Sequence, residues 1–254
     1  MLVISGNQMK TFEQAAVRNF ENRLLAHLQE FFPKHCEILG NDQMRKVIQL
    51  GLKRAEPYGL ISERDLHLYI GLMLMLGSYF DEDPQLPWTA KILTDENIVD
   101  PRRRADRLYR RAMAYLNQAA GKDSQYLDRA LRKAREFPVS ALSRTGEDKL
   151  ISFGDYLLKL LYRLFFEKYE AVGETNIRQM VRQGYQTAKA YHLTGEPDLA
   201  AYICLMFMLG SGFNHDPQYP WADIVLNDAA LIDSTQKGES LYKAAMTHLE
   251  KWLA

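Results

Sequence analysis

The chain has 254 residues, of which 47% are apolar and 25% charged, so it can bury the core of one large domain or of two small ones. Its 32 basic and 32 acidic side chains balance, which argues against a protein drawn to nucleic acid or membranes by its overall charge. The two cysteines, Cys36 and Cys204, are too few for a disulfide framework and favour a reducing compartment. The N-terminus lacks the features of a secretory signal, and the longest apolar run, residues 66–76, is too short to cross a membrane. We therefore expect a soluble, cytoplasmic protein.

The first third of the chain predicts two long helices. Apolar residues recur at helical steps over residues 8–32, and Pro33 ends that pattern. A second helix is expected to be capped at Asn41 and stopped at Gly59.

A third helix is expected between Ser62 and Gly77, and it is apolar on nearly every side, which places it at the centre of the core. A loop with two prolines follows over residues 81–88, and a short helical turn over residues 88–93. The last helix of this region is predicted over residues 101–120, because proline favours the first turn.

The sequence then repeats itself at an offset of 133 residues. Residues 69–88 read YIGLMLMLGSYFDEDPQLPW, residues 202–221 read YICLMFMLGSGFNHDPQYPW, and 14 of the 20 aligned positions are identical. A period this long predicts two copies of a domain-sized unit rather than a solenoid.

These patterns predict an all-α protein built from two tandem copies of one helical unit, with about five helices in each copy. The first copy spans residues 1–121 and the second spans residues 137–254. The charged, periodic stretch over residues 122–136 is expected to be a helical connector. Since the offset has no gap, we expect the copies to pack about a pseudo-twofold axis.

The most specific shared feature is the loop that follows the third helix of each copy. An acidic cluster can bind a hard cation, but the second copy has Asn214 where the first has Asp81, and Asp-Pro is a common turn. We interpret the loop as structural, with its flanking aromatic residues buried. The motif residues are Phe80, Asp81, Asp83, Pro84, Pro87 and Trp88 in the first copy and Phe213, Asp216, Pro217, Pro220 and Trp221 in the second.

Charge distinguishes the two copies. Helical geometry places five arginines of the last helix of the first copy on one outward face, with Tyr109 among the residues on the packed side. The equivalent stretch of the second copy keeps only Lys237 and Lys243. The face is either solvated surface or a binding site for an acidic protein partner, and nucleic acid is not favoured. Its residues are Arg103, Arg104, Arg107, Arg110 and Arg111.

The sequence resembles one bacterial family in three places. These are the string from Tyr58 to Asp65, the repeated motif behind it, and an opening Ile4-Ser5-x-x-Gln8-Met9 followed by Phe12 and Phe20. Its members are small helical proteins encoded in type VI secretion effector clusters, beside PAAR spike proteins and effector-adaptor chaperones. The resemblance covers most of the first copy and is weaker in the second, which has His192 where the first has Gly59. It implies a cytoplasmic accessory role in effector loading, as an adaptor or co-chaperone, and it implies no catalytic residues.

No metal-ligand spacing, nucleophile motif, phosphate loop or dinucleotide fingerprint is present, so we predict no catalytic residues, cofactor or metal. The favoured function is a non-enzymatic protein that binds an effector-adaptor chaperone or an effector. The alternative is an immunity protein that neutralises a cognate toxin domain. A small hydrolase or nucleic-acid enzyme is the lesser alternative.

Overall fold

The computed structural model describes residues 6–136 and 138–253, with side chains from Arg18 onward. Ile4 and Ser5, and the side chains of Gln8, Met9 and Phe12, lie outside the described residues. Within the described ranges the protein is helical and contains no β-strand. The α-helices are α1 (Gly6–Phe31), α2 (Pro33–Ala55), α3 (Glu63–Leu76), α4 (Pro87–Leu93), α5 (Pro101–Ala119), α6 (Gln125–Glu136), α7 (Phe153–Leu164), α8 (Phe166–Val172), α9 (Glu174–Ala190), α10 (Glu196–Leu209), α11 (Pro220–Leu226) and α12 (Ser234–Leu253).

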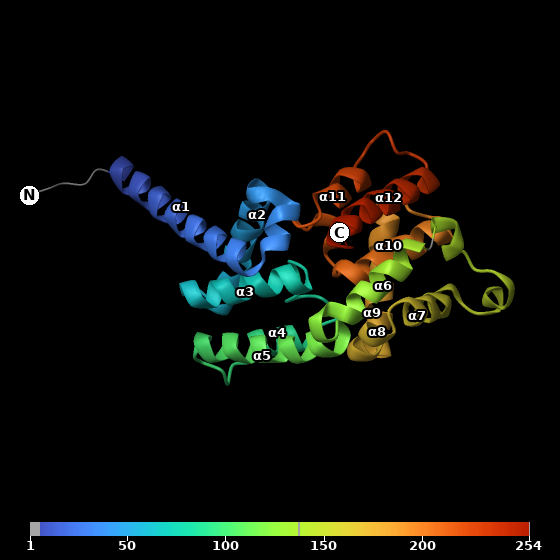
Figure 1. Cartoon of the computed structure of the whole chain (residues 1–254), viewed down its shortest axis with the longest axis horizontal. Helices are drawn as coiled ribbons and strands as arrows, with labels where there is room; N and C mark the ends of the chain where they lie inside the picture. The colour runs from blue at the N-terminus through green and yellow to red at the C-terminus, as the bar shows by residue number, and fades with distance from the viewer. Residues whose placement is uncertain (1–5, 137, 254) are drawn as a thin grey trace, which may run out of the picture.

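Short 3₁₀ turns occupy Glu56–Tyr58, Lys122–Ser124, Val139–Leu142, Gly146–Leu150 and Phe213–His215. The helices up to α5 gather on one side of the molecule, and those from α6 onward gather on the other (Figure 1). None of the described helices is both long enough and apolar enough to cross a membrane.

The start of the chain differs from the prediction in one respect. Pro33 does not open a loop but begins α2 at once, after a non-helical Phe32. The second helix therefore starts earlier than Asn41, and Gly40 interrupts it with φ 74° and ψ 164°. Gly173, 133 residues later, has φ 81° and ψ 143° and separates α8 from α9. A positive φ is accessible to glycine because it has no Cβ, so both kinks lie at glycines.

Two helices form the centre of the protein, as their apolar sequences predict. Helix α3 begins where Ser62 caps the Asp65 amide at 3.2 Å and ends at Gly77, and most of its residues are buried. Helix α10 has the same length, begins and ends 133 residues later, and is buried almost throughout. The connector is helical over Gln125–Glu136, after a turn at Lys122–Ser124.

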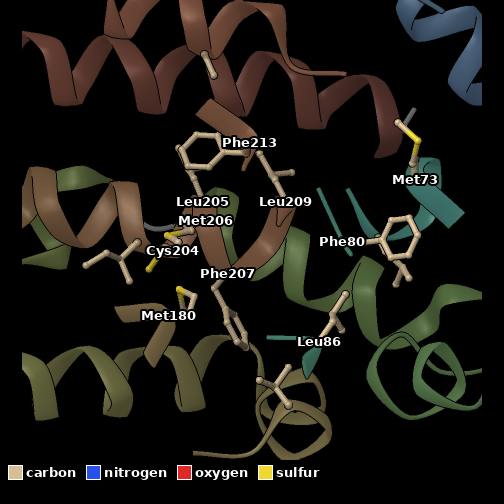
Figure 2. Close-up of a cluster of buried hydrophobic side chains, with 14 of the residues drawn as sticks. Met73, Phe80, Leu86, Met180, Cys204, Leu205, Met206, Phe207, Leu209 and Phe213 are labelled. Carbon is tan, nitrogen blue, oxygen red and sulfur yellow. The ribbon is translucent and has the colours of Figure 1, made fainter. Parts of the chain in front are cut away.

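The core runs continuously through both groups of helices. Met73, Phe80 and Leu86 come from the first group, while Phe207 and Phe213 come from the second (Figure 2). Because one buried cluster includes residues from both groups, we expect the two to unfold together.

Candidate functional site

The two proline-containing loops lie against each other in the middle of the protein and exchange hydrogen bonds. The Asp83 carboxylate accepts from the Ser211 backbone N–H at 2.7 Å and from its hydroxyl at 2.6 Å. The Asp216 carboxylate accepts from the same two groups of Ser78, both at 2.7 Å. Each bond therefore has a counterpart displaced by 133 residues along the chain.

Two glutamines extend this network. The Gln85 side-chain amide donates to the Met206 carbonyl oxygen at 3.1 Å, and that of Gln218 donates to the Met73 carbonyl oxygen at 2.9 Å. Both glutamines are buried, so these bonds join each loop to the C-terminal end of the other group's central helix.

The acidic residues of the first loop already have their partners within the protein. Burial raises the pKa of Asp83, and hydrogen bonds from Ser211 and Gln85 oppose that rise. Asp81 accepts from Arg54 at 2.7 Å and from the Tyr58 hydroxyl at 2.9 Å. Within the described residues, no three His, Cys, Asp or Glu side chains are grouped so as to hold a metal ion. The loop geometry therefore fits a structural role.

The aromatic residues that flank the loops are buried to different degrees. Phe80 and Phe213 are fully buried, as expected from the sequence. Trp88 and Trp221 are only half-buried, which corrects the prediction that all four rings are buried. Pro87 and Pro220 begin α4 and α11, and the buried position in the first turn of each short helix belongs to the residue after the tryptophan, Thr89 or Ala222. Pro84 is buried and Pro217 half-buried within the loops themselves.

The second half of the protein has neutral residues at the positions that correspond to the Arg54–Asp81 ion pair. Arg54 corresponds to Thr187 and Asp81 to Asn214, and the Asn214 side chain donates to the Tyr191 hydroxyl at 3.0 Å. The second half therefore lacks both members of the Arg54–Asp81 ion pair. This is consistent with physical coupling between them, because either charge alone would be buried without a partner.

The α5 arginines do not form one uniform face. Arg103, Arg107, Arg110 and Arg111 are exposed, as predicted. Arg104 is half-buried instead, and its guanidinium donates to the carbonyl oxygens of Tyr58 at 2.6 Å and Ile98 at 2.7 Å. It therefore ties two loops to the helix and is not part of the outward face.

Tyr109 corrects the prediction in the opposite sense. Helical periodicity predicts that it lies on the packed side of α5, but its side chain is exposed, with 44% of its surface accessible. Arg111, although exposed, lies over the Trp88 ring with 5.2 Å between its Cζ and the ring centroid. The outward face is therefore made chiefly by Arg103, Arg107 and Arg110.

These three arginines make only weak contacts with other groups of the chain. Arg103 lies 3.9 Å from the Asp100 carboxylate, and Arg107 lies 3.5 Å from that of Asp95. Arg110 donates to the Asp106 backbone carbonyl at 3.3 Å. Exposed contacts of this kind contribute about 0–1 kcal/mol each, so the guanidinium groups can exchange them for other partners.

A groove runs beside this face. It lies between the loop that precedes α5 and the helix itself, and it is lined by Asn97, Ile98, Val99, Asp100, Arg103, Asp106, Arg107 and Arg110.

Two exposed aliphatic side chains lie on the loop that lines the groove and on the loop beside it, and the sequence prediction did not include them. Val99 exposes 86% of its surface, and Ile61 exposes 73%. They lie on neighbouring loops, because the Arg104 guanidinium joins the carbonyl oxygens of Tyr58 and Ile98. The sequence signal that could have indicated such an exposed residue is an aliphatic side chain within a short polar loop, as in the stretch from Asn97 to Asp100. We call Ile61, Val99, Arg103, Arg107 and Arg110 the α5 surface.

Comparisons with protein-family models, curated proteins and solved structures gave no match to the chain.

Proposed function

We propose that the protein is a non-enzymatic accessory that binds a protein partner through the α5 surface. The observation that carries this proposal is the exposed Val99 side chain in a groove lined by three weakly held arginines, with Ile61 exposed on the neighbouring loop. Protein interfaces combine apolar anchors with arginine, and they are depleted in most other charged residues.

The chemistry of this surface favours an acidic partner. A guanidinium can hold a carboxylate through two parallel hydrogen bonds, which gives strong and directional contacts. Arg103 and Arg107 contact carboxylates of their own chain only at long distances, and Arg110 contacts a backbone carbonyl, so an acidic partner can displace these contacts at little cost.

The resemblance to proteins of type VI secretion effector clusters supplies the cellular setting of this proposal. In that setting the partner is an effector-adaptor chaperone or an effector held before secretion. An immunity protein would use the same surface differently, since it would bind a toxin domain and block its activity.

The proposal also takes the chain as two copies of one helical unit, related by a pseudo-twofold axis between the loops. The exchanged hydrogen bonds of Asp83 and Asp216 support it, as do helix boundaries that recur at the 133-residue offset in α3 and α10. Only the first copy carries the arginine face. Arg103, Arg107 and Arg110 correspond to Gln236, Ser240 and Lys243.

The test begins with purification of the full chain from its native host and identification of the bound protein by mass spectrometry. The double variant Arg107→Glu/Arg110→Glu should then weaken binding of that partner at least tenfold, without lowering the melting temperature. Association with the unaltered protein should slow as salt rises, because exposed charges are screened beyond about 8–10 Å at physiological ionic strength.

The matched control is Ser240→Glu/Lys243→Glu, which places the same charges at the equivalent positions of α12. It should bind the partner normally. Equal affinity of both double variants would contradict the role of the α5 surface. A partner that is a toxin domain, inhibited at one-to-one stoichiometry, would support the immunity alternative instead.

A further inference from the structure

The last helix of each half packs with the same face. The buried residues of α5 are Ala105, Leu108, Ala112 and Tyr115, and those of α12 include Gly238, Leu241, Ala245 and His248, each 133 residues later. The break before the second helix recurs as well, since Phe32 has φ −130° and ψ 51° and Phe165 has φ −132° and ψ 48°. The surfaces of the two halves can therefore be compared residue by residue.

In the second half, the chain before α7 covers a face formed by α7, α10 and α12. The 3₁₀ turn Val139–Leu142 packs on α10 and α12, and α6 packs on α7 and α12; together they are called the covering segment. Ala134 and Leu142 are buried there, and the Tyr242 hydroxyl donates to the Ala134 carbonyl oxygen at 2.7 Å. The residues that line one space with Ala134 and Leu142 include Leu164, Ala201, Tyr242 and Met246.

The corresponding face of the first half is open in the part of the chain that the structure describes. Its residues, 133 positions earlier, are Phe31, Leu68, Tyr109 and Met113, which we call the α1–α3–α5 face. Phe31 exposes 60% of its surface, whereas its counterpart Leu164 exposes 4%. Tyr109 is exposed and Tyr242 is half-buried. Leu68 and Met113 are half-buried and pack against the core, so the face is apolar and continuous with it.

The backbone explains the difference between the halves. Residues 139–142 correspond to residues 6–9, which belong to α1. Helix α1 has 26 residues and α7 has 12, and the N-terminal end of α1 extends away from α3 and α5 (Figure 1). The first half therefore continues as a helix where the second half folds back over its central helix.

The covering segment shows what kind of structure fits such a face. Helix α6 is amphipathic, because Ala130, Leu131 and Ala134 are buried while its charged side chains are exposed. An amphipathic helix that lays its apolar side on a hydrophobic surface is a common mode of recognition between proteins.

Charge gives the occupant of the first half a second property. Arg129 of α6 pairs with Glu167 of α8, and Glu167 corresponds to Lys34. A helix on the α1–α3–α5 face therefore meets a cation where α6 meets an anion. Other charged side chains of α1, α3 and α5 already pair between helices, as Arg23 does with Glu63 and Arg64 with Asp106. An acidic residue at the position of Arg129 suits Lys34 better than a basic one.

We propose that the α1–α3–α5 face binds an amphipathic helix of a partner protein, which lies there as α6 lies on the second half. The helix places small apolar residues against Tyr109 and Met113 and an acidic residue beside Lys34. The Tyr109 hydroxyl donates to one of its backbone carbonyl oxygens, as Tyr242 does to Ala134. The face has no residue in common with the α5 surface, so this inference does not depend on the function proposed above.

The probe is a synthetic peptide with the sequence of residues 125–142 and the change Arg129→Glu, titrated into the full chain. We expect it to bind and to shift the methyl resonance of Met113. The methyl resonance of Met246 should stay unchanged, because the covering segment already occupies that face.

The charge preference is tested by exchanging both partners. The peptide that retains Arg129 should bind about fivefold more weakly, because Lys34 repels the arginine and attracts the glutamate. Lys34→Glu in the protein reproduces Glu167 and should reverse the order of the two peptides.

A pair of variants locates the binding face. Phe31→Gln/Tyr109→Gln should lower the affinity about tenfold with little change in melting temperature, because both side chains are exposed. The matched control, Ile61→Gln/Val99→Gln, changes two exposed aliphatic residues of the α5 surface and should bind the peptide normally.

The proposal is overturned if the acidic peptide leaves the Met113 methyl resonance of the unaltered protein unshifted at millimolar concentration. Equal affinity of Phe31→Gln/Tyr109→Gln and the unaltered protein would also overturn it. A Met113 shift that depends on protein concentration without peptide would assign the face to a second copy of the chain instead.

Discussion

Asp83 and Ser211 are 128 residues apart in the chain, yet the Asp83 carboxylate accepts hydrogen bonds from both the backbone N–H and the hydroxyl of Ser211. Both residues are buried, so water cannot replace either partner. Ser78 and Asp216 form the corresponding pair in the opposite direction. The two pairs couple the folding of one group of helices to that of the other.

Asp83→Asn should destabilise the protein by about 2–4 kcal/mol, because the amide directs N–H donors at groups that are themselves donors. Urea unfolding followed by tryptophan fluorescence measures the loss. Glu82→Gln, at an exposed position of the same loop, is the matched control and should change stability by less than about 0.5 kcal/mol. Equal midpoints for the two variants would show that the Asp83–Ser211 contact contributes nothing.

The two aromatic residues of the first loop should differ in their contributions. Phe80→Ala removes a fully buried ring and should cost about 3–5 kcal/mol. Trp88→Ala removes a half-buried ring and its contact with Arg111, and it should cost about half as much. Thermal unfolding of both variants checks the order, with Tyr109→Ala as an exposed aromatic control. A larger loss of stability for Trp88→Ala than for Phe80→Ala would contradict the greater contribution that we assign to Phe80.

Arg54 and Asp81 should behave as a coupled pair. Arg54→Thr leaves a buried carboxylate without its cation, and Asp81→Asn leaves the guanidinium without its anion, so each should destabilise the protein. The double variant reproduces Thr187 and Asn214 of the second half and should recover about 1–3 kcal/mol relative to the sum of the single effects. A double-mutant cycle by urea unfolding measures this coupling. Strict additivity would mean that the two side chains contribute independently.

His248 should make stability depend on pH. The Trp252 indole N–H donates to His248 Nε2 at 3.1 Å, which requires a neutral imidazole. Burial, followed by the charges of Lys251 and His35, lowers the pKa of His248 to about 4. The unfolded chain takes up this proton near pH 6.5, so stability is lost as the pH falls from about 7 towards 4, by up to about 3 kcal/mol.

Other groups also change stability with pH. Burial raises the pKa of Asp216, so its protonation favours the folded state as the pH falls, and a comparison of variants is needed to isolate the contribution of His248. His248→Gln keeps an acceptor for Trp252 but does not titrate, so it should lose less stability than the unaltered protein between pH 7 and pH 4.5. His192→Gln, at an exposed position, should retain the full dependence. Urea unfolding at both pH values provides the measurement, and identical pH profiles for the two variants would contradict the role of His248.

The sequence by itself determined most of the helices and the central place of two of them. Ser62 and Gly77 mark the ends of α3, and an apolar surface on nearly every side predicts its burial. These signals act between residues that are close in the chain, through capping, backbone freedom and helical periodicity, so they can be read without a partner. The repeat at 133 residues was equally plain, and it singled out the loops that meet in the middle.

Tertiary structure alone decided which side chains of the candidate site face outward. Helical geometry gives Arg104 and Arg107 nearly the same face of α5, yet Arg104 turns towards the Tyr58 and Ile98 carbonyl oxygens because another loop lies within its reach. Tyr109 is exposed, although the same geometry assigns it to the packed side of α5. Long, flexible side chains take the partners that distant segments provide, and periodicity along one helix carries no information about those segments.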